Sequence, residues 1–266
     1  MVRPFDQSQG RPFGLTKRCA ASEQQLAHPA VEQGPYHLGD RFDAQVESLV
    51  DLSGRLAREA ADAADRTVLV AGSLPPLFGS YEPDNFDADA APALLQRIVD
   101  ALAPHVDVLL METMSSLAEI EVTAEAARRH EVPLWIAATL SDGTRGGTSV
   151  LRSGESVADA ALLTVEVGAD ALLFNCSEPE VMEAAIVEAR AALPPDVSVG
   201  AYANAFVEKP EEYDANGVVL DHRADLDGGG YTEFVERWLG AGASIVGGCC
   251  GIMPAHIALL DELRRP

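Results

Sequence analysis

The chain has 266 residues, 47% of them hydrophobic, and a formal net charge of −23. This length fits a single α/β barrel domain of roughly 250 residues. The excess of 42 acidic over 19 basic residues argues against nucleic acid and anionic membranes as partners, because an acidic surface repels phosphate groups. No apolar run reaches the ~18 residues of a membrane span, and the first residues lack the apolar core of a signal peptide, so we expect a cytoplasmic protein.

From residue 45 onward, short apolar runs alternate with segments that have helical spacing. The spacing predicts helices at 45–64, 90–103, 116–130, 155–167, 178–192, 231–241 and 254–264. Six strands are predicted to start near residues 67, 106, 133, 170, 197 and 243. These strands are nearly continuous apolar runs, which is typical of parallel strands buried on both faces. The alternation therefore predicts an α/β fold built on a parallel sheet.

A closed (β/α)8 barrel needs two more strands than the six predicted here. Residues 1–44 would have to supply them, but this stretch is rich in Gln, Pro, Gly, His and Arg and holds no β-branched or aromatic run long enough for a core strand. Its composition is typical of loop or disorder. We therefore predict a TIM barrel that is incomplete or atypical at its N-terminal end, with an atypical segment at 1–44 and a barrel domain at 45–266.

Three of the four cysteines follow predicted strands. Cys176 comes after Asn175 at the end of one strand, and Cys249 and Cys250 lie in the Gly-Gly-Cys-Cys-Gly sequence that ends the last. The active sites of parallel barrels lie at the C-terminal ends of the strands. Three thiolates would leave one position of a tetrahedral Zn²⁺ open, as in catalytic zinc sites, and a substrate thiol placed there would be held as thiolate.

Two other interpretations of the cysteines stay open at this point. Buried cysteines often serve only as small hydrophobic side chains, and Cys249 with Cys250 could form a redox pair. Cys19 stands alone in a polar stretch and receives no role.

Five segments, taken together, resemble the homocysteine S-methyltransferase family. They are AGSLPPLFGSYEPD (71–84), METMSSLAEIEVTAEAA (111–127), LLFNCSEPE (172–180), GAYANAF (200–206) and GASIVGGCCGIMPAHI (242–257). The resemblance runs from about residue 45 to the C-terminus. It implies a (β/α)8 barrel that binds homocysteine, with Zn²⁺ on Cys176, Cys249 and Cys250. It also implies methyl transfer from S-methylmethionine or S-adenosylmethionine to homocysteine, giving methionine.

The resemblance also bears on two non-cysteine site residues. It implies that Glu112 binds the amino group of the substrate. In the competing interpretation, Glu112 is a solvated acid that precedes a helix, and Ser116 and Glu119 form the capping box of that helix. Asn175 either orients Cys176 through a hydrogen bond or simply ends a strand. His256 is expected on a helix surface, and the loop from Asp142 is expected to be a lid or a plain loop.

The family normally opens with an Asp-Gly-Gly-x-Gly-Thr-Glu type motif that contributes to homocysteine binding, and residues 1–44 do not contain it. This leaves three hypotheses: an active methyltransferase that acts on small molecules, a non-catalytic or truncated relative that binds zinc without substrate, or a thiol redox protein that uses Cys249 and Cys250. The sequence does not reveal the oligomeric state.

Overall fold

The computed structural model describes residues 13–14, 40–143, 149–207 and 220–263. Within these ranges, seven strands form one sheet in the order β1-β7-β6-β5-β4-β3-β2, and every pairing is parallel. The strands are β1 (Phe13–Gly14), β2 (Ala71–Leu74), β3 (Val108–Met114), β4 (Leu134–Ala138), β5 (Ala171–Asn175), β6 (Ser198–Tyr202) and β7 (Ile245–Val246).

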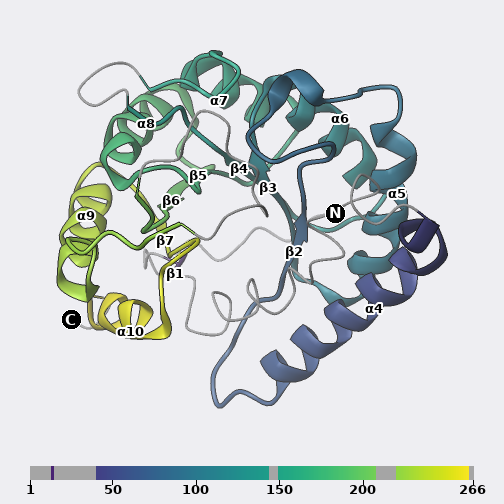
Figure 1. Cartoon of the computed structure of the whole chain (residues 1–266), viewed down its shortest axis with the longest axis horizontal. Helices are drawn as coiled ribbons and strands as arrows, with labels where there is room; N and C mark the ends of the chain where they lie inside the picture. The colour runs from purple at the N-terminus through teal and green to yellow at the C-terminus, as the bar shows by residue number, and fades with distance from the viewer. Residues whose placement is uncertain (1–12, 15–39, 144–148, 208–219, 264–266) are drawn as a thin grey trace.

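Helices follow the strands and cover the outside of the sheet. They are α4 (Asp40–Asp62), α5 (Ala91–Leu102), α6 (Leu117–Ala127), α7 (Val157–Glu166), α8 (Pro179–Ala192), α9 (Gly228–Gly240) and α10 (Pro254–Leu263), with short 3₁₀ turns η1 (Pro83–Asn85) and η2 (Ala103–His105). Figure 1 shows these helices in an arc around the strands. Strands inside and helices outside make the described part a partial α/β barrel, because β1 and β2 end the sheet and are not paired with each other. This agrees with the predicted incomplete barrel. Among the described helices, none is both long and apolar enough to cross a bilayer.

The two faces of the sheet bury different side chains. One face packs against the helices and forms the larger apolar cluster. The other forms a smaller cluster inside the barrel, made of Leu110, Ala137, Ala171, Leu173, Tyr202 and Ile245. Because successive residues of a strand point to opposite faces, a strand buried on both sides must be apolar throughout. This is why the sequence showed apolar runs and no strict alternation.

All six predicted strands and all seven predicted helices are present. The structure adds β1, where Phe13 and Gly14 pair with Ile245 and Val246 of β7. We did not predict this strand, because two residues paired through their backbone leave almost no pattern in the sequence. The helix predicted to begin at 45 begins at Asp40. The rest of the proposed 1–44 segment lies outside the described residues, so its boundary stays a prediction.

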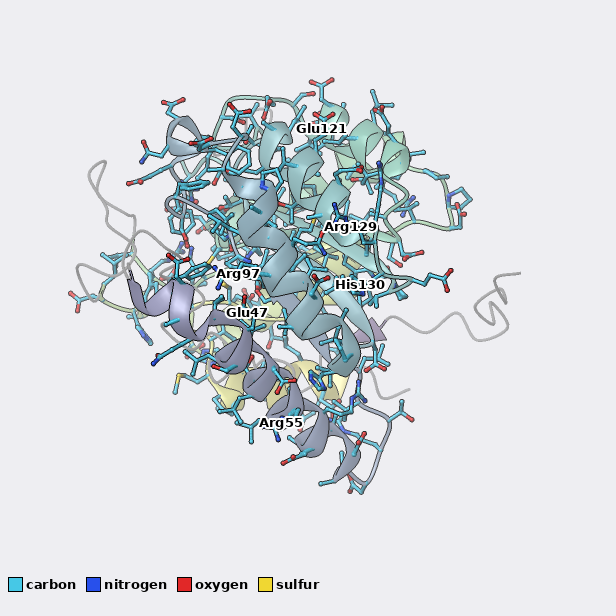
Figure 2. The ribbon with its side chains drawn as sticks, turned by 90° about the vertical axis from the view of Figure 1, so that its right-hand side faces the viewer. Glu47, Arg55, Arg97, Glu121, Arg129 and His130 are labelled. Atoms are coloured by element: carbon cyan, nitrogen blue, oxygen red, sulfur yellow. The ribbon has the colours of Figure 1, made fainter. Side chains whose placement is uncertain are left out.

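Helix α4 is held by its buried apolar residues more than by its charges. Phe42, Val46 and Val50 are almost fully buried, and the helix packs on α5 and η2. On the outer face, Arg97 of α5 binds Glu47 at 2.5 Å, and this hydrogen bond lowers the pKa of the Glu47 carboxyl. Figure 2 shows Arg97 and Glu47 at this contact between the two helices. An exposed ion pair stabilises little, so the apolar residues fix the position of the helix that leads into β2.

Candidate active site

The three cysteines come together at the C-terminal ends of β5 and β7. The Sγ of Cys176 lies 2.7 Å from that of Cys249 and 3.6 Å from that of Cys250. The Cys249 and Cys250 sulfurs are 3.8 Å apart. Cys176 is buried, Cys249 is half-buried and Cys250 is exposed. The cluster therefore has one side toward solvent, where a small molecule can approach.

The spacing and chemistry of the three thiols fit a zinc ion. Zn–S bonds of about 2.3 Å in a tetrahedral arrangement place two sulfurs about 3.8 Å apart. Two of the three observed distances lie close to this value, whereas the Cys176–Cys249 pair is about 1 Å closer and would have to open. None of the three described cysteines is in a disulfide. Three soft sulfur donors without a fourth protein ligand are typical of a catalytic zinc site.

Without a cation, this arrangement disfavours thiolates. Hydrogen bonds of the Cys249 thiol with Cys176 and Cys250, which hold its proton, raise the pKa of Cys249 well above its ordinary value, and burial adds to the rise. Burial, followed by the nearby cysteine charges, also raises the pKa of Tyr81, whose hydroxyl is hydrogen-bonded to Cys176. A divalent cation at the centre of the cluster would reverse the effect on the thiols, because coordinated thiols lose their protons.

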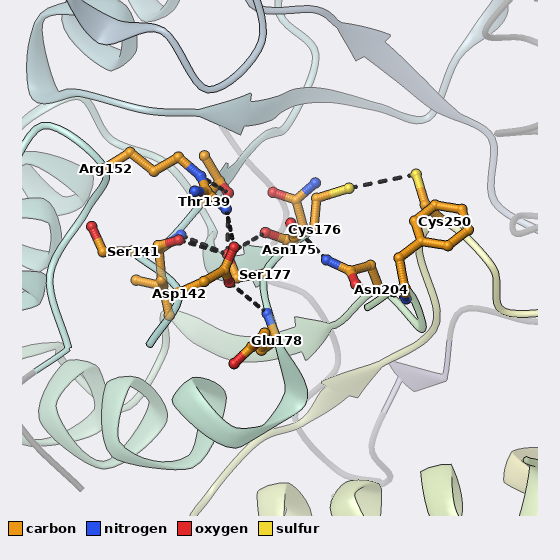
Figure 3. Close-up of polar contacts among 12 residues, drawn as sticks. Thr139, Ser141, Asp142, Arg152, Asn175, Cys176, Ser177, Glu178, Asn204 and Cys250 are labelled. Atoms are coloured by element: carbon orange, nitrogen blue, oxygen red, sulfur yellow. Dashed lines mark hydrogen bonds and ion pairs between the residues drawn. The ribbon is translucent and has the colours of Figure 1, made fainter. Parts of the chain in front are cut away.

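The backbone of the cysteine loops is held from β6 and the loop after it. The side-chain amide of Asn204 donates to the carbonyl oxygen of Cys176 at 3.0 Å, and the Cys249 N–H donates to the Ala203 carbonyl at 3.0 Å. Asn204, Cys176 and Cys250 are shown in Figure 3. Asn175, expected either to orient Cys176 or to end a strand, ends β5, and its side-chain amide donates to the Thr113 hydroxyl. Its Oδ1 is buried and has no partner among the described residues.

The glycines beside the cysteine pair have a steric role. Gly251 has φ +79°, a backbone conformation in which a side chain is costly. A Cβ on Gly248 would lie 2.1 Å from Cγ2 of Ile252. The tight turn that brings Cys249 and Cys250 to one point therefore requires glycine at both positions.

Tyr231 and His256 support this turn from outside the site. The buried Tyr231 hydroxyl lies 2.8 Å from the Gly247 carbonyl and 3.2 Å from the Ala203 carbonyl. His256 accepts the Met253 N–H at 3.0 Å and lies 3.1 Å from the Leu226 carbonyl. His256 thus uses both ring nitrogens in structural contacts.

Glu112 is held at the inner side of the barrel by side chains from two other strands, β2 beside it and β6 three strands away in the sheet. Its carboxylate accepts a hydrogen bond from Ser73 of β2 at 2.6 Å and one from Tyr202 of β6 at 3.0 Å. Glu112 is half-buried, and the register of β3 shifts between Met111 and Met114. Such a β-bulge redirects side chains. The carboxylate is therefore fixed in place and is not a loosely solvated loop acid.

A capping interaction follows Glu112, as predicted. The Ser116 hydroxyl accepts the Glu119 N–H at 3.2 Å, and the Glu119 carboxylate accepts the Ser115 N–H at 2.7 Å. Burial raises the pKa of Glu119 to about 7, although the hydrogen bond from Ser115 lowers it in part. The charge of the nearby Glu155 adds to the rise.

This raised pKa predicts that Glu119 makes stability depend on pH. Between about pH 5 and pH 8, the free energy of unfolding of the natural protein should fall by about 2–3 kcal/mol relative to Glu119→Gln. The folded state holds the proton more tightly than the unfolded chain in this window, so stability is lost as pH rises toward 7. Urea unfolding at several pH values measures the difference. Glu121→Gln, exposed on the same helix, is the control, and a constant difference across the window would contradict the prediction.

The structure also reveals residues that the sequence analysis missed. Arg152 donates to Asp142 at 2.8 Å and to Thr139 at 3.2 Å, and its guanidinium lies 4.7 Å from the ring centre of Tyr81. Asp142 in turn accepts the Glu178 N–H at 2.8 Å, two residues after Cys176. Figure 3 shows Arg152, Asp142 and Glu178 beside the cysteines. The loop expected to be a lid or a plain loop begins with this anchored Asp142, and residues 144–148 lie outside the described part, so the choice between the two stays open.

This geometry can be compared with known proteins. The sequence model described as homocysteine S-methyltransferase matches residues 24–263. The chain belongs to the homocysteine S-methyltransferase family. The matched range includes Glu112 and the three clustered cysteines, and it starts at residue 24 rather than near 45, where the motifs had placed the beginning of the resemblance. Family membership makes the chain a methyltransferase enzyme.

Individual relatives agree with this assignment. The homocysteine S-methyltransferase of Escherichia coli K12 is 31% identical over 237 residues, which cover 82% of this chain and 72% of that protein. The selenocysteine methyltransferase of Astragalus bisulcatus is 26% identical, with coverage of 81% and 70%. The metallated form of the homocysteine methyltransferase MmuM from Escherichia coli shares the fold at a TM-score of 0.70 and 24% identity, covering 93% of this chain and 83% of that one.

Proposed function

We propose that this methyltransferase moves a methyl group from a sulfonium donor, S-methylmethionine or S-adenosylmethionine, to the thiol of homocysteine, giving methionine. We further propose that Cys176, Cys249 and Cys250 hold Zn²⁺. The observation that carries the proposal is the cluster of three thiols at the barrel mouth, with sulfur spacings near those of a zinc site and one side open. The family match supports the same reaction.

A bound Zn²⁺ would lower the pKa of the substrate thiol and hold it as a thiolate at neutral pH. The chain's own residues would position the rest of homocysteine. The Glu112 carboxylate would accept hydrogen bonds from the ammonium group, while Ser73 and Tyr202 keep that carboxylate from rotating. The methyl group would pass to sulfur, and the donor sulfonium would leave as a neutral thioether.

The direct test is methionine formation by the purified protein loaded with zinc. We expect one zinc per chain and methionine production from homocysteine with at least one of the two sulfonium donors. A folded, zinc-loaded protein that makes no methionine with either donor would contradict the proposal and favour the non-catalytic hypothesis.

Glu112→Gln is expected to raise the KM for homocysteine by about 10- to 100-fold, because hydrogen bonds to a charged group contribute about 1.5–3 kcal/mol. The glutamine keeps the size of the side chain. Its oxygen can accept from one of Ser73 and Tyr202, and its NH2 group can donate to the hydroxyl oxygen of the other, so zinc content should not change. Steady-state kinetics at saturating donor measure the effect. Glu121→Gln on the outer face of α6 is the matched control. An unchanged KM would remove Glu112 from the binding site.

A further inference from the structure

Two residues at the ends of β3 and β5 have an unusual backbone conformation. Thr113 has φ +59° and Cys176 has φ +54°, a left-handed region that residues other than glycine enter at a cost. The cost is larger for Thr113, because its side chain is β-branched. Each residue lies beside a proposed binding group: Thr113 follows Glu112, and Cys176 is itself a proposed zinc ligand.

A side-chain hydrogen bond joins these two strand ends. The Asn175 amide donates to the hydroxyl of Thr113 at 2.8 Å, and both side chains are buried. Strand β4 lies between β3 and β5 in the sheet, so the bond crosses the end of β4. Near this end, β4 places the small side chain of Ala137 in the cluster inside the barrel, and the larger Trp135 packs against the cluster further back along the strand.

We infer that Thr113 is a positioning residue that fixes the distance between the Glu112 carboxylate and the Cys176 sulfur. Its hydroxyl ties the strand of the carboxylate to the strand of the thiol, and its left-handed backbone belongs to the bulge that redirects Glu112. A ligand that reaches both the Glu112 carboxylate and the proposed zinc on Cys176 needs an ammonium group and a thiol at a fixed distance from each other. Thr113 would thereby help the site to select an aminothiol over a simple thiol. The inference rests on the function proposed above.

The test compares two ligands that differ only in the ammonium group: homocysteine and 4-mercaptobutyrate. Calorimetry on zinc-loaded protein gives a dissociation constant for each. For Thr113→Val, which keeps the shape of the side chain but not the hydroxyl, we expect homocysteine to bind about 5- to 10-fold more weakly, as expected for one lost hydrogen bond. Binding of 4-mercaptobutyrate should be unchanged. Thr113→Ser should restore the preference for homocysteine.

Two further variants separate positioning from a purely structural role. Thr113→Gly removes the hydroxyl and also the strain, so it should unfold no more easily than the natural protein and still lose the preference for homocysteine. Thr164→Val removes a buried hydroxyl in α7 that bonds the Ala160 carbonyl at 2.7 Å; it should leave both dissociation constants unchanged.

The outcomes distinguish this inference from the proposed function. If the natural protein binds both ligands equally, the proposed ammonium site fails and the inference falls with it. If the natural protein prefers homocysteine and Thr113→Val and Thr113→Gly keep that preference, or weaken both ligands equally, the inference alone is overturned.

Discussion

Replacing Cys176 with serine is expected to abolish tight zinc binding and to lower methyl transfer at least 1000-fold, roughly the loss typical of removing a group essential to catalysis. A serine hydroxyl stays protonated at neutral pH and cannot replace a thiolate on zinc. Cys176 is also the most buried of the three cysteines, so water would have difficulty reaching the vacated coordination position. Elemental analysis for zinc and a methionine assay measure the two effects.

The matched control for this substitution is Cys19→Ser. Cys19 receives no role from the sequence, so the variant should keep one zinc per chain and full activity. If Cys176→Ser retained zinc and activity while Cys19→Ser did not, the ligand assignment would be wrong. Equal zinc content in all variants would point to a metal bound elsewhere.

The largest effect on stability is expected from Gly200→Ala. A Cβ at this position would lie 2.2 Å from the carbonyl oxygen of Ile245, which is backbone of the neighbouring strand β7 and cannot rotate away. Strands β6 and β7 would have to separate, and we expect a loss of about 3 kcal/mol or more in the free energy of unfolding. Because Cys249 and Cys250 follow β7 closely, zinc affinity should fall as well. Urea unfolding and zinc titration measure both.

Gly240→Ala is the control for this prediction. Gly240 ends α9, and a Cβ there would meet no heavy atom within 4 Å. The variant should unfold within about 0.5 kcal/mol of the natural protein or be slightly more stable, since alanine is the better helix former. If Gly200→Ala were as mild as Gly240→Ala, the close approach of β6 and β7 would be wrong.

Much of the architecture could be predicted because it depends on local patterns. Apolar runs ending in Gly, Asn or Ser marked the strands, and helical spacing between them marked the helices. The parallel order then placed Cys176 and Cys249 at the same rim, because the carboxyl ends of parallel strands meet there. The capping interaction of Ser116 with Glu119 was visible for the same reason, since it involves residues only three apart.

What the sequence did not reveal depends on contacts between distant segments. Arg152, which follows β4, contacts the ring of Tyr81, which follows β2. The hydrogen bond from Asn175 to Thr113 joins β5 to β3, which are not adjacent in the sheet. Left-handed backbone at Thr113 and Cys176 carries no sequence signal, because neither residue type favours it. Of the two roles expected for Asn175, the structure shows the end of a strand, and its amide bonds to the distant Thr113, a partner that the sequence did not indicate.

The graded burial of the three cysteines has a consequence for how the proposed metal would enter. A zinc ion that arrives from solvent would meet the exposed Cys250 first, then the half-buried Cys249, and the buried Cys176 last. Loading would therefore be an inward sequence of ligand exchanges. Because Cys176 is the thiol least open to water, exchange at this innermost ligand would set how long a bound ion stays during dilution or chelation.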